Sequence, residues 1–478
     1  MPPGGNRKEP PIGKVSTPFG VARELPYAEF MEELLPLLDP RIDFNTLTLN
    51  TQKRRSNLPM TKNSHLWGYS TKKPSTKRSL GIEPTLVFKN NDNAEWTLEK
   101  RDMDALPDAY LLLRSSSEED VNWTSIAVPG AYSIWDTPDT FRENVVKITR
   151  CMSQCMYRDA RRRFVYAFTI QDERMRLWWC DRVKILFTES FDCIAHSVLL
   201  FEFFISVMYA PPERLGFDPT MKLLNHPRDN VHLAQYEISV RSEDGEEHQY
   251  KTLALLADAE ETILGRNTRV WKAIKIENGV PVGEPVVLKD AWVHPYRDRE
   301  GAIYSRVWTT ASEAQRNALE AACISVLCHG DVFVCESPDC AMYYKDALRC
   351  RNRGAARAIE AHASQCEAHH LIHNRVVFKQ IGRSMLGETS LAKIFGGLRD
   401  AANALQVLHE CGWIHGDIST GNILLVNDRA VLTDLEYAQH KDERRNHDKT
   451  GALQRASKTG VRAGSLVASA LPLQALSR

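Results

Sequence analysis

A short stretch near the end of the chain carries the residue types that transfer of a phosphoryl group requires. Asp417 stands five residues before Asn422, and a second carboxylate, Asp434, follows two apolar runs. In ATP-dependent phosphotransferases one Asp orients the attacking hydroxyl, while an Asn and another Asp hold Mg²⁺. We therefore predict that Asp417 is the catalytic carboxylate and that Asn422 and Asp434 are magnesium ligands, because oxygen donors suit this hard cation. His415 is expected to brace the loop by hydrogen bonding.

Residues that would bind the phosphates of a nucleotide are predicted earlier in the chain. Lys289 ends the apolar run Val286–Leu288. A lysine on such a strand pairs with the α- and β-phosphates and with a glutamate on the following helix. A lysine at the end of an apolar run is commonplace by itself. The Asp417 loop, about 125 residues later, supports a phosphate-binding role for Lys289. Glu300, which opens a helical stretch, is the first candidate for the glutamate, and Glu313 is the second.

A turn between two predicted strands is the candidate phosphate-covering loop. It spans Leu264–Val270, and Gly265, Asn267 and Val270 are its predicted cofactor-binding residues. Glycine lets backbone N–H groups approach a phosphate, and asparagine tolerates unusual backbone angles where a second glycine is expected. A later apolar run, residues 376–382, fits a hinge whose backbone pairs with an adenine ring. An ordinary strand followed by a turn fits that run equally well.

Apolar periodicity predicts the elements that must position these residues. Between residues 236 and 292, short apolar or alternating runs are separated by polar turns, which predicts an antiparallel sheet. Apolar residues at three- and four-residue spacing predict a helix over Leu398–Leu408, which Gly396 and Gly397 separate from a shorter helix at Leu391–Phe395. The predicted strands are Tyr236–Val240, Tyr250–Leu256, Glu261–Leu264, Arg269–Ile276 and Pro285–Trp292, with a later pair at Ile423–Val426 and Ala430–Thr433.

A separate patterned block precedes this sheet. Two strand-like runs around a polar turn, a third short strand and a buried helix near Leu199–Met208 predict a small α+β module. Residues 1–25, rich in Pro, Gly and charge, are predicted to be disordered. The predicted segments are 1–25, disordered; 26–119, N-terminal helix and basic linker; 120–230, α+β module; 235–385, sheet-rich small lobe; 386–450, helical part with the catalytic loop; and 451–478, disordered tail.

The composition is that of an ordinary soluble globular protein. Hydrophobic residues make up 43% and charged residues 26% of the chain, and the formal net charge is zero. Nothing in this balance favours a nucleic acid or a membrane as partner. The longest apolar helical stretch, residues 193–210, contains Glu202 and is too short to span a bilayer. No signal segment follows Met1, so we expect an intracellular protein, cytoplasmic or nuclear, with free cysteines.

Two other clusters leave alternatives open. Residues 51–80 are basic and rich in Ser and Thr, which indicates a solvated linker, with a nuclear import signal or an anion-docking segment as the alternative. Cysteines and histidines between Cys335 and His373 include zinc-ligating types but lack paired Cys-x-x-Cys units. We interpret them as core cysteines and solvated histidines, with a metal site as the alternative.

Taken together, these residues make the chain resemble the fungal-type protein kinases of mushroom-forming fungi. The resemblance covers roughly residues 26–449. It implies an α+β, two-lobed protein kinase-like fold, with an antiparallel-sheet small lobe and an incomplete helical large lobe, behind the N-terminal module. It also implies ATP and Mg²⁺ as cofactors, with Lys289 on ATP. The matching stretches are residues 121–130, Met175–Cys180, Leu288–Trp292, His415–Leu425 and Asp434–Ala438.

The chain departs from that family's pattern at the reactive loop. Gly416 stands where the family usually has an arginine that pairs with an activation-loop phosphate, so such a switch is not expected. His-Gly-Asp also resembles kinases of small molecules. Ser419 stands where many protein kinases place a lysine against the γ-phosphate, and Glu436 replaces the glycine after the metal-binding Asp, although Asp-Leu-Glu is normal for this fungal family.

The stretch that follows Asp434 is the largest departure. Only 44 residues follow it, whereas the large lobe of such kinases continues for well over a hundred. The missing part includes the helix on which the catalytic loop rests. Losing on the order of 1,000 Å² of apolar burial at about 25 cal/mol per Å² would exceed the net stability of a typical domain. We therefore expect the chain as written to be unstable or impaired.

Three functions remain as hypotheses at this point. The first is an ATP-dependent kinase of protein hydroxyl groups, of the Ser/Thr type, whose protein substrate and oligomeric state are open. The second is a pseudokinase or ATP-binding scaffold, and the third is a small-molecule phosphotransferase. If the site is as predicted, Lys289 and Asp434 should lie within about 10 Å of each other across one cleft.

Overall fold

The structure is a computed structural model in which the chain forms two compact units. Unit one comprises Met1–Arg299 and Val326–Ile381, and unit two comprises Glu300–Ser325 and Gly382–Arg478. The described residues are 14–36, 42, 83–91, 106–114, 121–225, 234–258, 263–295, 297–334, 337–338, 340–341, 371–427 and 429–442.

The first part of unit one is an α+β module built on a nine-stranded mixed sheet. Its strand order is β1-β2-β8-β7-β6-β5-β4-β3, and β9 pairs with β7. The pairs β2–β8 and β5–β6 are parallel, and the other pairs are antiparallel. The strands are β1 Lys14–Thr17, β2 Gly20–Leu25, β3 Leu86–Asn90, β4 Ala109–Leu113, β5 Ile126–Ser133, β6 Val165–Gln171, β7 Arg174–Cys180, β8 Ile185–Thr188 and β9 Phe191–Asp192.

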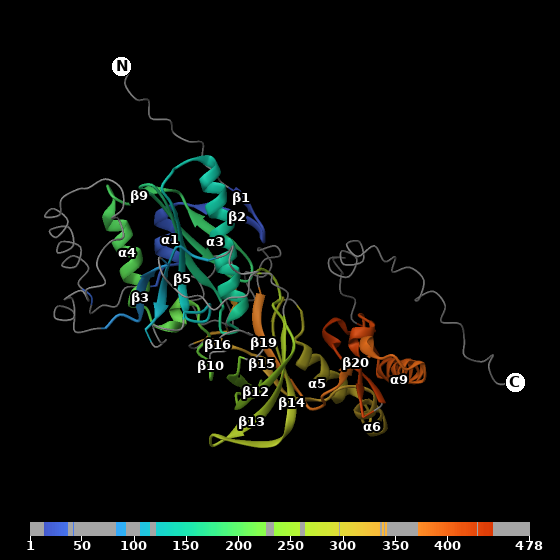
Figure 1. The fold of residues 1–478 in the computed structure, drawn as a ribbon. Coiled ribbons are helices and arrows are strands. Elements are labelled where there is room, and N and C mark those ends of the chain that lie inside the picture. Colours follow the sequence, from blue (N-terminus) through green and yellow to red (C-terminus); the bar gives the residue numbers. More distant parts are fainter. Residues whose placement is uncertain are drawn as a thin grey trace, which may run out of the picture. The chain divides into compact units, whose positions relative to one another are not determined.

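Helices cover both faces of this sheet (Figure 1). Helix α3 (Pro138–Arg158) packs on one face, where Phe141, Val145 and Ile148 share a core with β6 and β7. Helices α1 (Tyr27–Glu33) and α4 (Ser197–Met208) pack on the other face. Because β5 and β6 are parallel, their connection must cross the sheet, and α3 is that crossover. The 3-10 turn η3 (Pro212–Leu215) follows α4.

The local sequence explains why α3 forms a helix, although this helix was not among the predicted elements. Thr137 caps its first turn by accepting a hydrogen bond from the Thr140 amide, and Pro138 occupies the first helical position. The apolar residues recur at helical spacing and are buried, namely Phe141, Val145, Ile148, Met152 and Cys155.

The module is larger than predicted. Residues 14–25, expected to be disordered, form β1 and β2, and β2 is held by parallel pairing with β8. The local composition of residues 14–25 favours disorder, but pairing with β8, which is distant in the sequence, keeps β2 in the sheet. The α4 helix confirms the helix predicted near Leu199–Met208, with Phe203, Phe204 and Val207 buried, and α1 ends at Glu33, before Pro36. The basic linker 51–80 lies outside the described residues.

The second sheet of unit one is antiparallel, as predicted for the small lobe. Its strand order is β10-β11-β12-β13-β14-β19-β15, and β18 pairs with β19. Glu261–Leu264, predicted as a strand, contributes none: residues 263–264 lie in a bend, and 261–262 are outside the described residues. The strands are β10 Met221–Leu223, β11 Tyr236–Arg241, β12 Glu247–Ala257, β13 Arg269–Glu277, β14 Val280–Val293, β15 Val326–Asp331, β18 Cys340–Ala341 and β19 Leu371–Phe378, with β16 Phe333–Val334 and β17 Ser337–Pro338 forming a separate pair.

Unit two contains three helices and two short sheets among its described residues. Sheet β20-β22-β23 packs beside α9, and β21 pairs with β24. The elements are α5 Glu300–Thr310, α6 Glu313–Ala322, β20 Arg383–Ser384, η5 Met385–Gly387, α9 Leu391–Glu410, β21 Trp413–Ile414, η6 Thr420–Asn422, β22 Ile423–Val426, β23 Arg429–Leu432, η7 Leu435–Tyr437 and β24 Gln439–His440.

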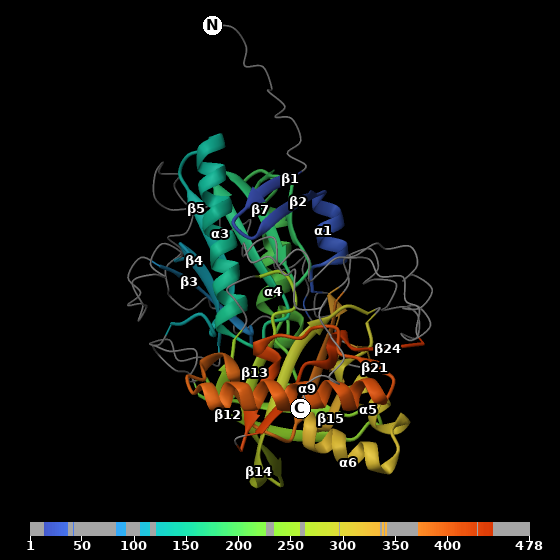
Figure 2. The same ribbon diagram turned by 90° about the vertical axis from the view of Figure 1, so that its right-hand side faces the viewer.

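Helix α9 is continuous from Leu391 to Glu410 (orange in Figure 2), so the predicted break at the two glycines is wrong. Gly397 is a packing residue, because a Cβ there would lie 2.9 Å from the Met385 sulfur. One face of the helix is buried through Gly397, Ala401, Ala404 and Leu408. Leu391, Phe395 and Leu398 are between 44% and 69% exposed, so an apolar stripe lies on its other side.

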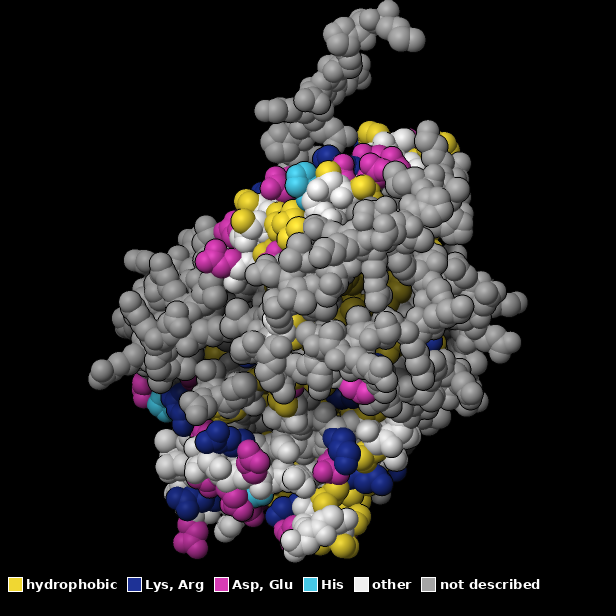
Figure 3. Space-filling model, turned by 90° about the vertical axis from the view of Figure 1, so that its left-hand side faces the viewer, with side chains coloured by type: hydrophobic (Ala, Val, Ile, Leu, Met, Phe, Trp, Pro, Cys, Tyr) yellow, Lys and Arg dark blue, Asp and Glu magenta, His cyan; other side chains and the backbone are white. Residues whose placement is uncertain are grey.

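Surface properties of the described residues agree with the balanced composition. On the face drawn in Figure 3, basic and acidic side chains are interspersed and do not gather into patches of one sign. Within the described ranges, each helix is too short or too polar to cross a bilayer.

Candidate active site

Two short antiparallel ladders hold the loop that carries Asp417. At one end β21 pairs with β24, so Trp413 lies opposite His440 and Ile414 opposite Gln439. At the other end β22 and β23 form the predicted hairpin, and Ile423 lies opposite Leu432. One ladder joins the residues before Asp417 to those after Asp434, and the other joins the residues after Asn422 to those before Asp434. The two predicted magnesium-binding segments therefore lie side by side.

The predicted reactive residues contact each other within this frame. The Asn422 side-chain amide donates to the Asp417 backbone oxygen at 2.9 Å and to Asp417 Oδ2 at 3.3 Å. The Asn422 carbonyl oxygen accepts from the amide of Thr433 at 3.1 Å, one residue before Asp434. With its Nδ2 directed at Asp417, Asn422 has Oδ1 left for a cation. An amide oxygen and a nearby carboxylate are ligands that suit Mg²⁺, so the donor set is compatible with that ion.

His415 braces the loop, as the sequence predicts. Its side chain is 2% exposed, and its Nε2 lies 3.1 Å from the Thr433 carbonyl oxygen. Burial lowers the pKa of His415 below the ordinary value of 6.5, although the Thr433 contact and the charges of Asp434 and Asp417 act in the opposite direction. The neutral ring, with Nε2–H donating, is therefore the form that the folded loop favours.

This pKa shift predicts how loop stability depends on pH. A folded-state pKa below 6.5 means that the unfolded chain binds more protons, so the His415 contribution is lost as the pH falls below 6.5. We expect the difference in melting temperature between wild type and His415→Gln to shrink between pH 7.5 and pH 5.5. Thermal melts at several pH values measure it, and a difference that grows in acid would contradict the prediction.

The structure explains why residue 416 is a glycine. Its φ is +80°, and a Cβ at this position would lie 2.4 Å from the Tyr437 carbonyl oxygen. Tyr437 belongs to η7, which follows Asp434. The close approach of these two segments therefore excludes any side chain at position 416, including the arginine common in the resembling family.

Helix α5 places Glu300 beside this loop, and α5 contacts η7. Glu300 is 6% exposed, whereas the alternative, Glu313, is exposed in the first turn of α6. One turn after Glu300 is Tyr304, which sequence reasoning missed. Burial, and then the charges of Glu300, Cys323 and Asp434, raise the pKa of Tyr304 well above its usual value. Glu300 is thus the buried one of the two candidates, and its pairing with Lys289 stays a prediction.

Lys289 lies in unit one, on the central strand β14. It is half-buried, and the sheet register places Val270 opposite it on β13 and Val376 opposite it on β19. Two predicted cofactor-binding residues, Lys289 and Val270, are therefore neighbours in the sheet. Lys289 and Asp434 belong to different units, so the predicted separation of about 10 Å between them remains a prediction.

The candidate phosphate-covering loop is attached to the N-terminal module. Ile263 is 1% exposed within the module's core, and Leu264 packs beside it. The Gly265 amide, predicted to approach a phosphate, donates to the Arg182 carbonyl oxygen at 2.7 Å. Asn267 has a φ of +42°, which agrees with the expected backbone tolerance. In this conformation the loop offers one amide fewer to a phosphate than the sequence predicts.

Two arginines complete this attachment at the end of α3. Arg269 donates to the Tyr157 carbonyl oxygen at 2.5 Å, and Arg182 donates to the Met156 carbonyl oxygen at 3.3 Å. The last carbonyls of a helix lack intrahelical partners and carry a partial negative charge, so two cations stabilise them. Burial, and then the charge of Arg269, lower the pKa of Arg182 to about 9, so its guanidinium stays charged at neutral pH.

The hinge candidate spans the junction of the two units. Val376–Phe378 end β19 in unit one, and Gly382 is the first residue of unit two. A Cβ on Gly382 would lie 2.7 Å from the Leu424 Cβ, so this position also requires glycine. Most of the cysteine and histidine cluster lies outside the described residues, and within the described ranges no three or more His, Cys, Asp or Glu side chains gather where they could hold a metal ion.

A sequence model of a family described as fungal protein kinase matches residues 107–463, which is more than half of the chain. The curated proteins contain no match. Among solved structures, the chain matches one titled "Structure of vaccinia related kinase 3" with 13% identity and a TM-score of 0.26. That match covers 42% of this chain and 51% of the solved one.

Proposed function

We propose that this chain, which belongs to the fungal protein kinase family, transfers the γ-phosphoryl group of ATP to hydroxyl groups of proteins. The observation that carries the proposal is the contact between Asn422 and Asp417 beside the segment of Asp434. In this proposal Asp417 orients the attacking hydroxyl of a serine or threonine, and its position is held by the Asn422 amide. Lys289 binds the α- and β-phosphates and takes Glu300 as its partner.

Asn422 Oδ1 and Asp434 would hold Mg²⁺, which neutralises charge on the phosphates when it is bound. The buried His415 keeps the loop in register by its contact with Thr433. Gly416 permits the close approach of η7, so the carboxylate of Asp434 is presented by a segment that cannot move away without breaking the β21–β24 pairing.

A second function, that of an ATP-binding scaffold, is favoured by one observation. The Gly265 amide donates to Arg182, so it is not directed at a nucleotide phosphate in this conformation. The small-molecule hypothesis rested mainly on Gly416. Because the Tyr437 carbonyl oxygen accounts for that glycine, its presence gives no reason to prefer a small-molecule substrate.

Phosphate transfer by the full chain tests the proposal. We expect incorporation of labelled phosphate from Mg-ATP into a mixture of proteins but not into small alcohols, and a loss of about 10²- to 10⁴-fold in Asp417→Ala. Asp442→Ala, which changes an exposed carboxylate after β24, should match wild type. Nucleotide binding without transfer would instead support the scaffold. Strong activity would also contradict the sequence-based expectation that this chain is impaired.

A further inference from the structure

A buried row of charged side chains crosses the sheet beside Lys289. Asp290, the next residue of β14, lies on the opposite face of the sheet, because side chains alternate along a strand. The register places Arg269 opposite Asp290 on β13 and Arg375 opposite it on β19. Cation, anion and cation thus lie on three adjacent strands, on the face of the sheet that Lys289 does not occupy.

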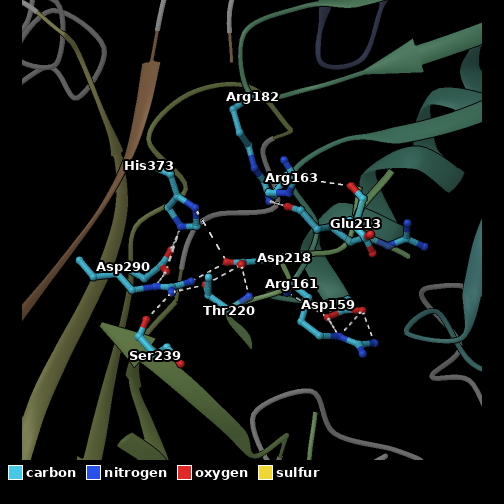
Figure 4. Close-up of polar contacts among 12 residues, drawn as sticks. Asp159, Arg161, Arg163, Arg182, Glu213, Asp218, Thr220, Ser239, Asp290 and His373 are labelled. Atoms are coloured by element: carbon cyan, nitrogen blue, oxygen red, sulfur yellow. Dashed lines mark hydrogen bonds and ion pairs between the residues drawn. The ribbon is translucent and has the colours of Figure 1, made fainter. Parts of the chain in front are cut away.

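Arg375 joins this row to the N-terminal module through Asp218. Figure 4 labels Asp218 together with Asp290 and His373. Its Nε donates to Asp290 Oδ2 at 2.8 Å, and one Nη donates to Asp218 Oδ2 at 2.5 Å. The other Nη donates to the Thr220 hydroxyl at 2.6 Å and to the Ser239 carbonyl oxygen at 2.8 Å. Each nitrogen of the guanidinium therefore has an acceptor, and the side chain is 1% exposed.

Asp218 belongs to the end of the module. Its amide donates to the Arg161 carbonyl oxygen at 2.7 Å, and its Oδ1 accepts from the amide and the hydroxyl of Thr220 at 2.8 and 2.6 Å. The side chain is fully buried. Arg375 thus bridges a carboxylate fixed in the module and a carboxylate one residue from Lys289.

His373 closes the cluster on β19. Its Nε2 lies 2.9 and 3.0 Å from the two oxygens of Asp290, and its ring stacks on Trp292 with centroids 4.6 Å apart. Burial alone would raise the pKa of Asp290, but His373 and Arg375 hold it well below its usual range. Asp290 is therefore ionised, and removal of a charge partner from this cluster leaves a buried charge uncompensated.

We propose that Asp218 and Arg375 are positioning residues through which the N-terminal module fixes the strand of Lys289. This rests on the proposed function, in which Lys289 binds nucleotide phosphate. Arg269 attaches the other side of the same row, because its guanidinium donates to Tyr157 of α3. Arg375 and His373 hold Asp290 from β19, and β13 pairs with β14 in the register that sets Arg269 opposite Asp290. A shift of β14 by one residue would break the Arg375 and His373 contacts and move Lys289 to the opposite face. The module is therefore part of the nucleotide-binding half of the protein.

The test compares Asp218→Asn with a matched control in the full chain. Asp218→Asn keeps the shape of the side chain, and we expect it to raise the KM for ATP about tenfold while kcat changes little. The control, Asp108→Asn, removes another partly buried carboxylate that pairs with Lys147 and Tyr132 inside the module. The control should lower the melting temperature without raising KM. Equal effects on KM in both variants would overturn the proposal.

Thr220→Val provides a milder variant, should Asp218→Asn fail to fold. It removes one acceptor of Arg375, and we expect a KM increase of about threefold. Combining either variant with Lys289→Met gives a double-mutant cycle, in which the measured quantity is the Kd for Mg-ATP. If the module acts through Lys289, Thr220→Val or Asp218→Asn should add no further loss of affinity to Lys289→Met. Additive losses would overturn the proposal.

A separate readout distinguishes this proposal from the proposed function. Amide hydrogen exchange of β14 requires no nucleotide, and we expect Thr220→Val to accelerate exchange in β14 and β19 but Asp108→Asn to leave it unchanged. Wild type that fails to bind Mg-ATP would reject the proposed function, whereas unchanged exchange in β14 would reject the positioning role.

Discussion

Replacing Gly416 by alanine is expected to destabilise unit two by about 2–5 kcal/mol. A left-handed backbone costs an L-residue about 1–2 kcal/mol, and forcing an extra carbon into a packed site typically costs about 1–3 kcal/mol. Both terms apply, because φ is +80° and the new Cβ would lie 2.4 Å from the Tyr437 carbonyl oxygen. At about 2–4 °C per kcal/mol, the melting temperature should fall by roughly 4–20 °C.

The matched control lies in the same loop. A Cβ on Gly421 would meet only the Ser419 hydroxyl oxygen, at an ordinary 3.6 Å, so Gly421→Ala should melt within about 2 °C of wild type. Gly416→Arg should be no milder than Gly416→Ala, because the clash is already complete at Cβ. Differential scanning calorimetry measures all three variants. If Gly416→Ala melted like wild type, the close approach of η7 to the catalytic loop would be wrong.

The hairpin and the contacts around Asp417 could be predicted because their determinants are local, whereas the catalytic role of this loop stays a prediction. Asp417, Asn422 and Asp434 lie within 18 residues of sequence, and the apolar runs between the last two make a hairpin with its own register. The alternation along β14 is equally local. It places Lys289 and Leu288 on opposite faces and needs no knowledge of distant residues. Such patterns determine which side chains share a face, and that was sufficient to locate these residues.

The attachment of the phosphate-loop candidate could not be predicted in this way. Its partners are Arg182 and the last carbonyls of α3, which come from much earlier in the sequence and carry no local signal of that contact. The glycines of α9 are another case in which a local pattern was not sufficient for prediction. A glycine pair favours a break locally, but packing of Gly397 against Met385 keeps the helix continuous. The ion pair Arg375–Asp218, which links the module to the second sheet within unit one, likewise joins residues far apart in the sequence and carries no local signal.

Asp434→Asn is expected to remove most magnesium-dependent nucleotide binding without unfolding the chain. Asp434 has φ +62° and ψ +61°, a left-handed conformation that Asn tolerates well, so the substitution keeps the backbone and the shape of the side chain. It removes the negative charge that would bind Mg²⁺. A metal ion contributes several kcal/mol of charge stabilisation to phosphoryl transfer, and 1.36 kcal/mol corresponds to a factor of ten. Transfer should therefore fall by more than about 100-fold.

Calorimetric titration of ATP, with and without Mg²⁺, separates the metal from the nucleotide. In wild type we expect Mg²⁺ to strengthen ATP binding, and in Asp434→Asn we expect the two titrations to coincide. Asp442→Asn serves as the charge-matched control, because Asp442 is 90% exposed and follows β24 in the same unit. Melting temperatures of the three proteins should agree within a few degrees, since surface and isosteric changes of this kind usually cost little.

The expected pattern distinguishes a metal ligand from a residue that only supports the loop. Asp434 directly precedes η7, which α5 contacts, so a purely structural Asp434 would show its loss as a lower melting temperature. A metal ligand instead loses the magnesium response at unchanged stability. Full retention of magnesium-dependent binding in Asp434→Asn would remove Asp434 from the site, and with it the proposal that this hairpin and the Asp417 loop together bind the metal and the nucleotide.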